Sequence, residues 1–441
     1  MATAKDTVPE ITAITVAGFK SIARETRIEI APLTLLAGAN SSGKSSVMQP
    51  LLLLKQTLEA TYDPGALLLS DSHVRFTDSS QLLSGPVRSQ VSEFTIGLDI
   101  GATRVVETFL KTKTGGFDLV SMSLAQDQIQ AQLQIGMREA EIRRVLNISG
   151  HARFTIVRER CFLTLKRDDL SFFVEHSNLI DLIYAGLLDL GSALRSLIHL
   201  PGLRGNPQRA YPVAAVGPSF VGPFPVYTAS VVLDWQERSD IRLKTVSNQL
   251  GKLGLTWKLE ARRLDATSVE LRVGRLPSPR RGGASDLVNI ADVGFGISQT
   301  LPVLVALLAA QPGQLVYLEQ PEIHLHPRAQ IVLAEILVEA ARRGVKVVAE
   351  THSSLLLIAI QTLVAQGKIT PDLVKLHWFQ RGDDGLSTVS SADLDEAGAF
   401  GDWPEDFAEV ELNAQGRYLD AAEARDLGNK PRARKTKAAR R

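Results

Sequence analysis

The hydrophobic pattern of the chain alternates between short apolar runs and helical stripes. Residues 33–37 form an apolar run of strand length, and a helical segment with four successive leucines at 51–54 follows it. Two more such runs, residues 315–318 and 345–349, flank a helical stretch at residues 328–343. Strands that alternate with helices indicate a largely parallel sheet covered by helices. We therefore expect an α/β fold.

The stretch between about residues 100 and 190 follows a different pattern. Polar and apolar residues alternate with period two at residues 153–157 and 161–165, as they do in strands with one buried face. Residues 128–146 fit a helix as well as a strand. We expect a strand-rich insertion here, between two parts of the α/β pattern.

The loop after the first apolar run carries the clearest chemistry. Residues 38–45 read G-x-x-x-x-G-K-S, a P-loop (Walker A) whose backbone N–H groups surround phosphates at a helix N-terminus. Lys44 can reach the β- and γ-phosphates, and the Ser45 hydroxyl can ligate Mg²⁺. Pro50 should kink the helix that follows. The loop predicts ATP and Mg²⁺ as cofactors, bound by Gly38, Asn40, Ser41, Ser42, Gly43, Lys44, Ser45 and Ser46.

The two apolar runs of the second half both end in an acidic residue. Residues 315–318 run into Glu319, and residues 345–349 run into Glu350, Thr351 and His352. A carboxylate after a buried strand is the Walker B arrangement that holds Mg²⁺, so Glu319 is the candidate metal ligand with Ser45. His352 ends a central strand, where ligands of parallel sheets bind, and it can sense a γ-phosphate.

A glycine-rich turn precedes the apolar helix at residues 301–310. Residues 292–299 read D-V-G-F-G-I-S-Q, and such a turn can offer a second helix N-terminus to phosphate. Gly294, Gly296 and Ser298 are the candidate contacts, and we refer to residues 292–298 as the signature turn.

The order Walker A, signature turn, Walker B and switch histidine resembles that of ABC-type ATPase heads. The opening residues 11–22 also resemble the first strand of RecF, SMC and OLD-family heads. E-Q-P-E-I-H-L-H-P at 319–327, D-V-G-F-G-I-S-Q-T-L-P at 292–302 and E-T-H-S at 350–353 are similar to a bacterial family of OLD-like AAA ATPases. Further marks of that family are an altered P-x-R-x-x-P box at 201–207 and a D-W-P-x-x-F box at 402–407. The resemblance spans about residues 10–420 and is weakest between 100 and 190.

The resemblance implies an ABC-type P-loop ATPase head that forms nucleotide-gated homodimers or higher even oligomers. In such heads, ATP lies between the P-loop of one subunit and the signature turn of the other. Related ATPases occur in anti-phage defence, so the kinship implies a sensor or scaffold that controls a separate nuclease or toxin effector. Two alternatives stay open: a RecF-like DNA-binding repair ATPase, and a structural protein that binds ATP without turnover.

One departure from ABC heads concerns hydrolysis. Most ABC heads end the Walker B strand in Asp-Glu, whereas this chain has Glu319-Gln320. Gln320 cannot accept a proton, and help from a general base is typically worth about 10²–10⁴-fold in rate. Glu322 is the nearest substitute base, and Glu350 is the next. We expect catalysis by Glu319, Gln320, Glu322 and His352 to be slow.

The patterns and the resemblance together predict five parts. These are an ATPase lobe with the P-loop at 1–100, the strand-rich insertion at 101–190, a second ATPase lobe at 191–380, a C-terminal cap at 381–424 and a basic tail at 425–441. The tail lacks the apolar residues of a core, so we expect it to be disordered. Contact with nucleic-acid phosphates and a solubilising role explain it equally well.

Composition narrows the class of protein. The 441 residues are 44% hydrophobic and 22% charged, as in ordinary globular proteins. The single cysteine, Cys161, excludes internal disulfides and a cysteine-based zinc site. The first residues do not read as a signal peptide, and residues 301–310 are too short to span a bilayer. We expect a cytoplasmic protein without a membrane partner; its net charge of +1 says nothing about nucleic acid.

Overall fold

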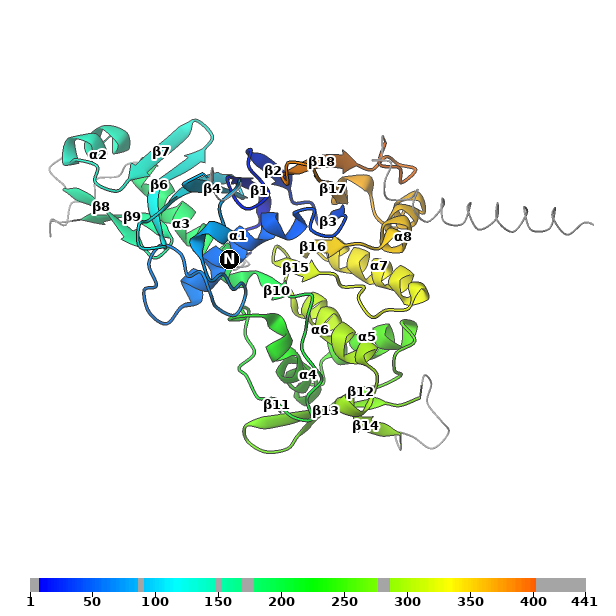
Figure 1. Ribbon diagram of the computed structural model, residues 1–441. Coiled ribbons are helices and arrows are strands. Elements are labelled where there is room, and N and C mark those ends of the chain that lie inside the picture. The colour runs from blue at the N-terminus through cyan, green and yellow to red at the C-terminus, as the bar shows by residue number, and fades with distance from the viewer. Residues whose placement is uncertain (1–7, 86–90, 148–152, 168–177, 277–285, 402–441) are drawn as a thin grey trace, which may run out of the picture. The chain divides into compact units, whose positions relative to one another are not determined.

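The computed structural model describes residues 8–85, 91–147, 153–167, 178–276 and 286–401 (Figure 1). The chain divides into two units, Met1–Gly401 and Asp402–Arg441, and all described residues belong to the first. The D-W-P-x-x-F box and the basic tail therefore lie outside the described residues.

A six-stranded sheet carries the P-loop strand at its centre. Its strands, in spatial order, are β10 (Ile198–Leu200), β15 (Leu315–Glu319), β16 (Lys346–Thr351), β3 (Leu33–Gly38), β17 (Val374–Arg381) and β18 (Ser387–Asp393). All neighbours run parallel except β17 and β18. Every residue of β3 is buried because strands flank it on both sides and helices cover the sheet, so its sequence is apolar apart from the buried Thr34. The expected α/β class with a mixed sheet is confirmed.

The helices around this sheet keep the expected order. They are α1 (Lys44–Glu59), α6 (Phe295–Ala309), α7 (Pro327–Arg342) and α8 (Ser354–Ala365), while α4 (Thr228–Glu237) and α5 (Ile241–Lys252) pack on α6. α6 packs on β10 and β15, while α7 packs on β16 and β3 and lies beside α8 (Figure 1). α1 continues through Pro50 as one helix; the proline does not end it.

A second six-stranded sheet is antiparallel. Its order is β2 (Thr26–Glu29), β1 (Ile11–Ala17), β4 (Glu93–Ile100), β5 (Thr103–Lys111), β6 (Phe117–Gln126) and β7 (Ile129–Gln134). The hairpin β8 (Phe154–Glu159) and β9 (Phe162–Arg167), with α2 (Glu139–Leu146) and α3 (Asn178–Ser196), completes this region. The ambiguous residues 128–146 contain a strand and a helix in succession, β7 and then α2. The domain boundaries expected from the sequence stay predictions.

A small sheet leads into the signature turn. It contains β11 (Tyr211–Pro212), β12 (Leu259–Arg263), β13 (Ser268–Gly274) and β14 (Leu287–Asn289), with β13 paired to the other three. Short 3₁₀ helices lie at Ser79–Gln81, Phe224–Tyr227, Ile290–Asp292 and Pro371–Leu373. The 3₁₀ helix at Ile290–Asp292 connects β14 to the start of α6, so this sheet is the immediate support of the signature turn.

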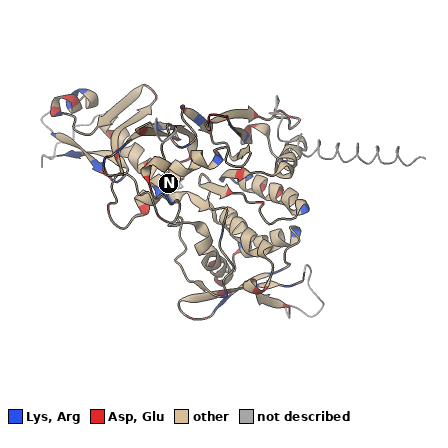
Figure 2. Cartoon of the chain, viewed as in Figure 1, with Lys and Arg blue, Asp and Glu red and all other residues tan. Residues whose placement is uncertain are grey.

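The charged residues of the described elements are mixed in sign. In the view of Figure 2, Lys and Arg are interspersed with Asp and Glu along the helices and strands. Among the described helices, none is both long and apolar enough to cross a membrane.

Candidate functional site

The P-loop has the backbone that its glycines require. Gly38 and Gly43 have φ angles of 141° and 102°, which side chains other than hydrogen rarely allow. A Cβ atom on Gly38 would collide with the carbonyl oxygen of Phe379, and one on Gly43 with the hydroxyl of Ser387. The loop therefore needs glycine at both positions for its backbone shape and for its close approach to β17 and β18.

Contacts from the C-terminal strands hold this loop in place. The Ser387 hydroxyl lies 2.6 Å from the carbonyl oxygen of Ser42 and 2.7 Å from the hydroxyl of Ser21. Arg381 donates a hydrogen bond of 3.1 Å from Nη1 to the carbonyl oxygen of Ser41. The P-loop conformation thus depends on residues more than 300 positions away in the sequence.

Lys44 is buried at the start of α1, with 5% of its surface exposed. Its ammonium donates to the carbonyl oxygens of Gly38, at 3.0 Å, and Ala39, at 2.8 Å. Burial lowers the pKa of Lys44, and the nearby carboxylates of Glu350 and Glu322 oppose that shift. The lysine is therefore folded back on its own loop, inside the curve where phosphate oxygens would lie.

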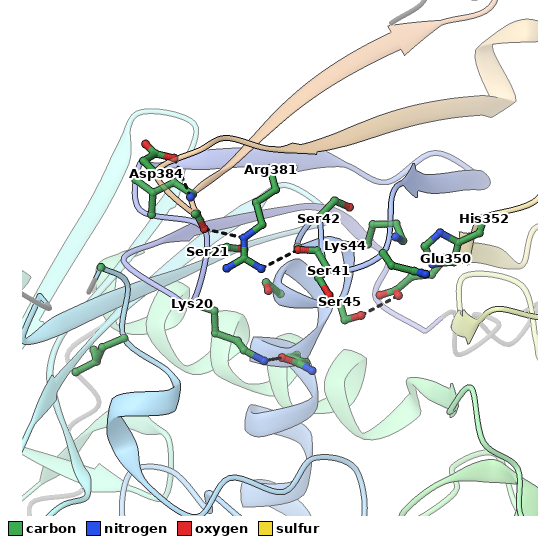
Figure 3. Close-up of a pocket in the computed structure, with 18 of the residues that line it drawn as sticks. Lys20, Ser21, Ser41, Ser42, Lys44, Ser45, Glu350, His352, Arg381 and Asp384 are labelled. Carbon is green, nitrogen blue, oxygen red and sulfur yellow. Dashed lines mark hydrogen bonds between the residues drawn. The ribbon is translucent and has the colours of Figure 1, made fainter. Parts of the chain in front are cut away.

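A pocket of about 760 Å³ opens at the P-loop (Figure 3). Its walls come from the P-loop, the connection between β1 and β2, the ends of β15 and β16, and the turn between β17 and β18. They are formed by Lys20, Ser21, Asn40, Ser41, Ser42, Gly43, Lys44, Ser45, Ser46, Gln49, Leu83, Gly85, Gln320, Glu350, His352, Arg381, Asp384, Gly385 and Leu386. Of the predicted P-loop contacts, only Gly38 is not part of the wall. The volume suits a nucleotide-sized ligand.

Ser45 meets a carboxylate, but that carboxylate belongs to Glu350. The Ser45 hydroxyl donates to Oε2 of Glu350 at 2.8 Å (Figure 3), while the Tyr317 hydroxyl donates to Oε1 of the same side chain. Burial raises the pKa of Glu350 to about 7, against the lowering effect of the Tyr317 hydrogen bond. The structure thus places Ser45 beside Glu350, while the expectation that Ser45 and Glu319 share a metal ion stays a prediction.

Glu319 ends β15 and turns to other partners. Its Oε1 lies 3.1 Å from Nε2 of His199, and its Oε2 accepts a 3.0 Å hydrogen bond from the backbone N–H of Gly202. Burial would raise the pKa of Glu319, but the hydrogen bonds from His199 and Gly202 and the charge of Arg204 bring it below its ordinary value.

His199 continues into a row of buried ionisable side chains. Its Nδ1 lies 3.0 Å from Nδ1 of His73, and Nε2 of His73 lies 3.2 Å from Oε2 of Glu59. Lys55 then pairs with Oε1 of Glu59 at 2.7 Å. We call Glu319, His199, His73, Glu59 and Lys55 the histidine line. It connects the end of β15 to the last turns of α1.

The other candidates of this strand edge have distinct positions. Gln320 has a left-handed backbone, with φ of 45°, and lines the pocket. Glu322 is buried; its Oε1 accepts hydrogen bonds from the Thr351 hydroxyl, at 2.7 Å, and from the backbone N–H of His352, at 3.1 Å. Burial and the charge of Lys44 lower the pKa of His352. Glu322 therefore holds the segment that presents His352 to the pocket.

Arg204, from the altered P-x-R-x-x-P box, joins the Walker B strand to α6. Its Nη2 donates to the backbone oxygens of Glu319, at 2.7 Å, and Gln320, at 3.3 Å, and its Nη1 to that of Gln299, at 3.3 Å. Burial lowers its pKa to about 10, opposed by the charges of Glu322 and Glu319. A charged guanidinium buried among backbone oxygens fixes the start of α6 relative to Gln320.

The signature turn is separate from the pocket. Among the described residues that line it, none is Gly294, Gly296 or Ser298. Gly294 is the N-cap of α6 and has open space around it, and no described side chain caps that helix end. The Ser298 hydroxyl donates to the carbonyl oxygen of Phe295 at 3.0 Å. The three predicted contacts therefore stand at a second site, with Ser298 turned toward its own helix.

Four residues of this region were missed in the sequence or received a minor role there. Glu350 was only the second alternative base, although it directly precedes Thr351 and His352. His199 and His73 carry no motif and become neighbours only in the folded chain. Arg204 was visible only as a box residue, without a role.

Comparison with known proteins gives one family match. Residues 157–359 match the family described as "AAA domain, putative AbiEii toxin, Type IV TA system". The matched part includes the signature turn, the Walker B strand and His352, and begins after the P-loop. It covers less than half of the chain and supports an ATPase of AAA type. No curated protein matches the sequence.

Solved structures with similar arrangements include heads of Smc proteins. One is the Smc head domain with an extended coiled coil bound to the C-terminal domain of ScpA from Pyrococcus furiosus, with a TM-score of 0.47, 12% identity and coverage of 87% of this chain and 96% of that chain. Another is an Smc head bound to the C-winged helix domain of ScpA. Its TM-score is 0.45 and its identity 13%, and the match covers 88% of this chain and 99% of that chain. The SMC head domain from Thermotoga maritima has a TM-score of 0.36 and 12% identity, and the match covers 86% of this chain and 98% of that chain. These TM-scores lie below 0.5, and the likeness carries no conclusion about function.

Proposed function

We propose that the chain is an ATP-binding, slowly hydrolysing ABC-type ATPase that works as a nucleotide-gated dimer and controls a separate effector. The observation that carries this is the pocket itself. Lys44, Ser45, Gln320, Glu350 and His352, from a P-loop and two adjacent strand ends, face one cavity at the carboxyl edge of a parallel sheet. That edge is where ligands of such sheets bind.

Nucleotide binding follows from the P-loop. The glycine-rich turn and the uncapped N-terminus of α1 present N–H groups and a positive dipole to phosphate. Lys44 would exchange its contacts with the carbonyl oxygens of Gly38 and Ala39 for β- and γ-phosphate oxygens. The site also fits Mg²⁺, because the Ser45 hydroxyl lies beside a carboxylate and Mg²⁺ is bound by one or two carboxylates together with substrate phosphates. When bound, the ion neutralises charge that develops on the phosphates.

Hydrolysis should be slow. The position that usually carries the base is Gln320, which can orient water but cannot take its proton. Glu322 is held by the Thr351 hydroxyl and the His352 N–H, which favours a positioning role over that of a base. We infer a long-lived ATP state, with turnover below the enzyme median of about 10 s⁻¹.

Dimerisation would complete the site. The signature turn lies outside the pocket of its own chain, yet the N-terminus of α6 is uncapped and open at Gly294. A second copy could bring this helix end to the γ-phosphate, and two-fold symmetry would then create two such sites. ATP contacts both subunits only in the closed state, so it favours that state.

Effector control is the outer part of the proposal. The description of the matching family names a toxin and a toxin–antitoxin system, and that supports a separate toxin or nuclease partner. Nucleic acid is a second proposed partner, through the basic tail.

The test combines binding, turnover and association. Purified protein should bind ATP with Mg²⁺, hydrolyse it slowly, and shift from monomer to dimer with ATP in light scattering. Affinity purification of the tagged protein should recover a stoichiometric partner. Nucleotide binding without any ATP-dependent association would sink the gated dimer, and stimulation of turnover by DNA without a partner would favour the repair alternative.

A further inference from the structure

Two carboxylates stand at the same level beside the P-loop. Glu319 of β15 and Glu350 of β16 are direct neighbours in the parallel register. Either could supply the carboxylate that holds a metal ion together with Ser45. Their hydrogen bonds distinguish them.

Glu350 is the carboxylate that reaches the P-loop. Its Oε2 accepts the Ser45 hydroxyl at 2.8 Å, and it lines the pocket with Ser45 and Lys44 (Figure 3). Tyr317 is fully buried beneath it, and its hydroxyl donates to Oε1. Because Tyr317 occupies one oxygen from the interior, the other oxygen faces Ser45. Glu350 is thus oriented from below by a residue that never reaches the pocket.

Glu319 turns away from β16 and toward β10, the neighbour of β15 on its other edge. Both of its oxygens have donors, His199 Nε2 at 3.1 Å and the Gly202 N–H at 3.0 Å. His199 is 1% exposed and lies in ring contact with Tyr317, with centroids 5.4 Å apart. Behind it, the histidine line is anchored where Lys55 donates to the carbonyl oxygens of Arg195, at 2.9 Å, and Phe220, at 3.2 Å. Moving Glu319 to Ser45 would leave Nε2 of His199 and the backbone N–H of Gly202 without their acceptor, and unpaired polar groups in the interior are costly.

We propose that Glu350, and not the Walker B residue Glu319, is the carboxylate that shares Mg²⁺ with Ser45. Tyr317 is a positioning residue for Glu350, and the histidine line is a positioning device that keeps Glu319 away from the ion. Mg²⁺ keeps several waters and needs only one or two carboxylates, so Ser45, Glu350 and the nucleotide phosphates suffice. This inference rests on the proposed function.

The test uses Mn²⁺ as a paramagnetic probe in place of Mg²⁺, with the full chain and a non-hydrolysable ATP analogue. Free Mn²⁺ is measured by electron paramagnetic resonance for the unsubstituted protein and for the matched pair Glu350→Gln and Glu319→Gln. Loss of an outer-shell partner alone costs about 10- to 100-fold in metal affinity. We expect Glu350→Gln to weaken Mn²⁺ at least that much and Glu319→Gln to change it less than about threefold. Thermal unfolding without metal or nucleotide checks that each variant folds.

Two further variants keep the test decisive if Glu350→Gln does not fold. Glu350→Asp keeps the charge but draws the carboxylate back, and should weaken Mn²⁺ binding. Tyr317→Phe should weaken Mn²⁺ binding and leave the affinity for the analogue in EDTA unchanged, which a general loss of structure would not do. Weakening by Glu319→Gln with none by Glu350→Gln or Glu350→Asp overturns the assignment, and so does equal weakening by both glutamine variants. A protein that binds the analogue under no condition overturns the proposed function itself.

Discussion

The P-loop and the signature turn are both glycine-rich segments that begin a helix, and neither helix is capped by a described side chain. They differ in what surrounds that helix end. The P-loop side adds a buried lysine, a hydroxyl and a carboxylate, all facing one pocket. The signature side differs in the residues that the structure describes: Gly294 faces open space, and the Ser298 hydroxyl is bound to the oxygen of Phe295.

This difference indicates a division of labour. The P-loop side has the charge needed to bind a nucleotide alone. A bare helix N-terminus contributes only about 0.3–1 kcal/mol toward a negative group when exposed, and up to about 2 kcal/mol when partly buried. Such a contact is too weak to capture ATP from solution, but it can report that ATP is already present. The gated dimer that we propose needs this asymmetry.

The largest expected effect comes from removing the charge of the P-loop side. Lys44→Ala should weaken ATP binding by about 100-fold or more, because hydrogen bonds to charged groups contribute about 1.5–3 kcal/mol each and Lys44 is the ammonium at the helix start. Titration with a fluorescent ATP analogue measures the change, and thermal unfolding without nucleotide serves as the folding control. Wild-type affinity in this variant would mean that the P-loop side does not bind phosphate as described.

The second change gives the P-loop side the base that it lacks. Gln320→Glu should raise the turnover rate by about 10²-fold, the lower end of general-base catalysis. Glu322→Gln is the companion variant and should reduce the residual wild-type rate, because a neutral amide oxygen accepts the hydrogen bonds from Thr351 and His352 more weakly than a carboxylate does. Phosphate release under saturating ATP measures both. Fast turnover of the unsubstituted protein that neither Glu322→Gln nor Glu350→Gln changes would show that the role given to Gln320 is wrong.

The third change addresses the signature side alone. Gly294→Asp fits the open space and the backbone there, with φ of −63° and ψ of 154°, and Asp is a favourable N-cap. The fold should be kept, while the new carboxylate occupies the N–H groups and repels phosphate. ATP-dependent association should weaken about tenfold or more, the effect of about 1.4 kcal/mol, with unchanged ATP binding to the monomer. Gly296→Asp should act alike, although its Cβ would lie 3.3 Å from Leu255.

Gly217→Asp is the matched control, because Gly217 also has open space around it and lies in neither turn. Light scattering with and without ATP compares the association of the variants Gly294→Asp, Gly296→Asp and Gly217→Asp. If Gly294→Asp associates as the control does, the signature turn is not the partner of the γ-phosphate.

The smallest effect is expected from deleting the basic tail, which leaves both the P-loop side and the signature side unchanged. Residues 430–441 contain seven Lys and Arg, and deleting them should lower nucleic-acid affinity. The salt dependence should become flatter, by about 0.9 logarithmic units of slope for each phosphate that the shorter protein no longer neutralises. ATP binding should stay the same. Equal retention of DNA by both proteins across a salt series would leave the tail a solubilising role.

The sequence predicts those parts of the molecule whose information is local. The strand of residues 33–37, the loop at 38–45 and the helix after it are adjacent along the chain, and their apolar pattern and glycines are sufficient to identify them. The same holds for the strand ends at Glu319 and Glu350. The α/β class was therefore predictable, and so was the position of the pocket at the strand ends.

The partners of each carboxylate were not predictable, because they depend on side chains that meet only in the fold. The Walker B pattern pairs Ser45 with Glu319, whereas Tyr317 and the histidine line direct Glu350 to Ser45 and Glu319 to His199. His73 and His199 lie 126 positions apart. The periodicity of the chain holds no information on contacts at such a separation.

The position of β3 has a consequence for the synthesis of the protein. β3 is made more than 300 residues before both of its neighbours in the sheet, β16 and β17. Ser45 precedes Glu350 by 305 residues, and Ser42 precedes Ser387 by 345. At about 5–20 residues per second, the ribosome leaves this apolar strand without its neighbours in the sheet for roughly 15–70 seconds. The nascent chain is thus exposed to aggregation during this interval, and a shorter, truncated product would never complete the loop that the first 60 residues encode.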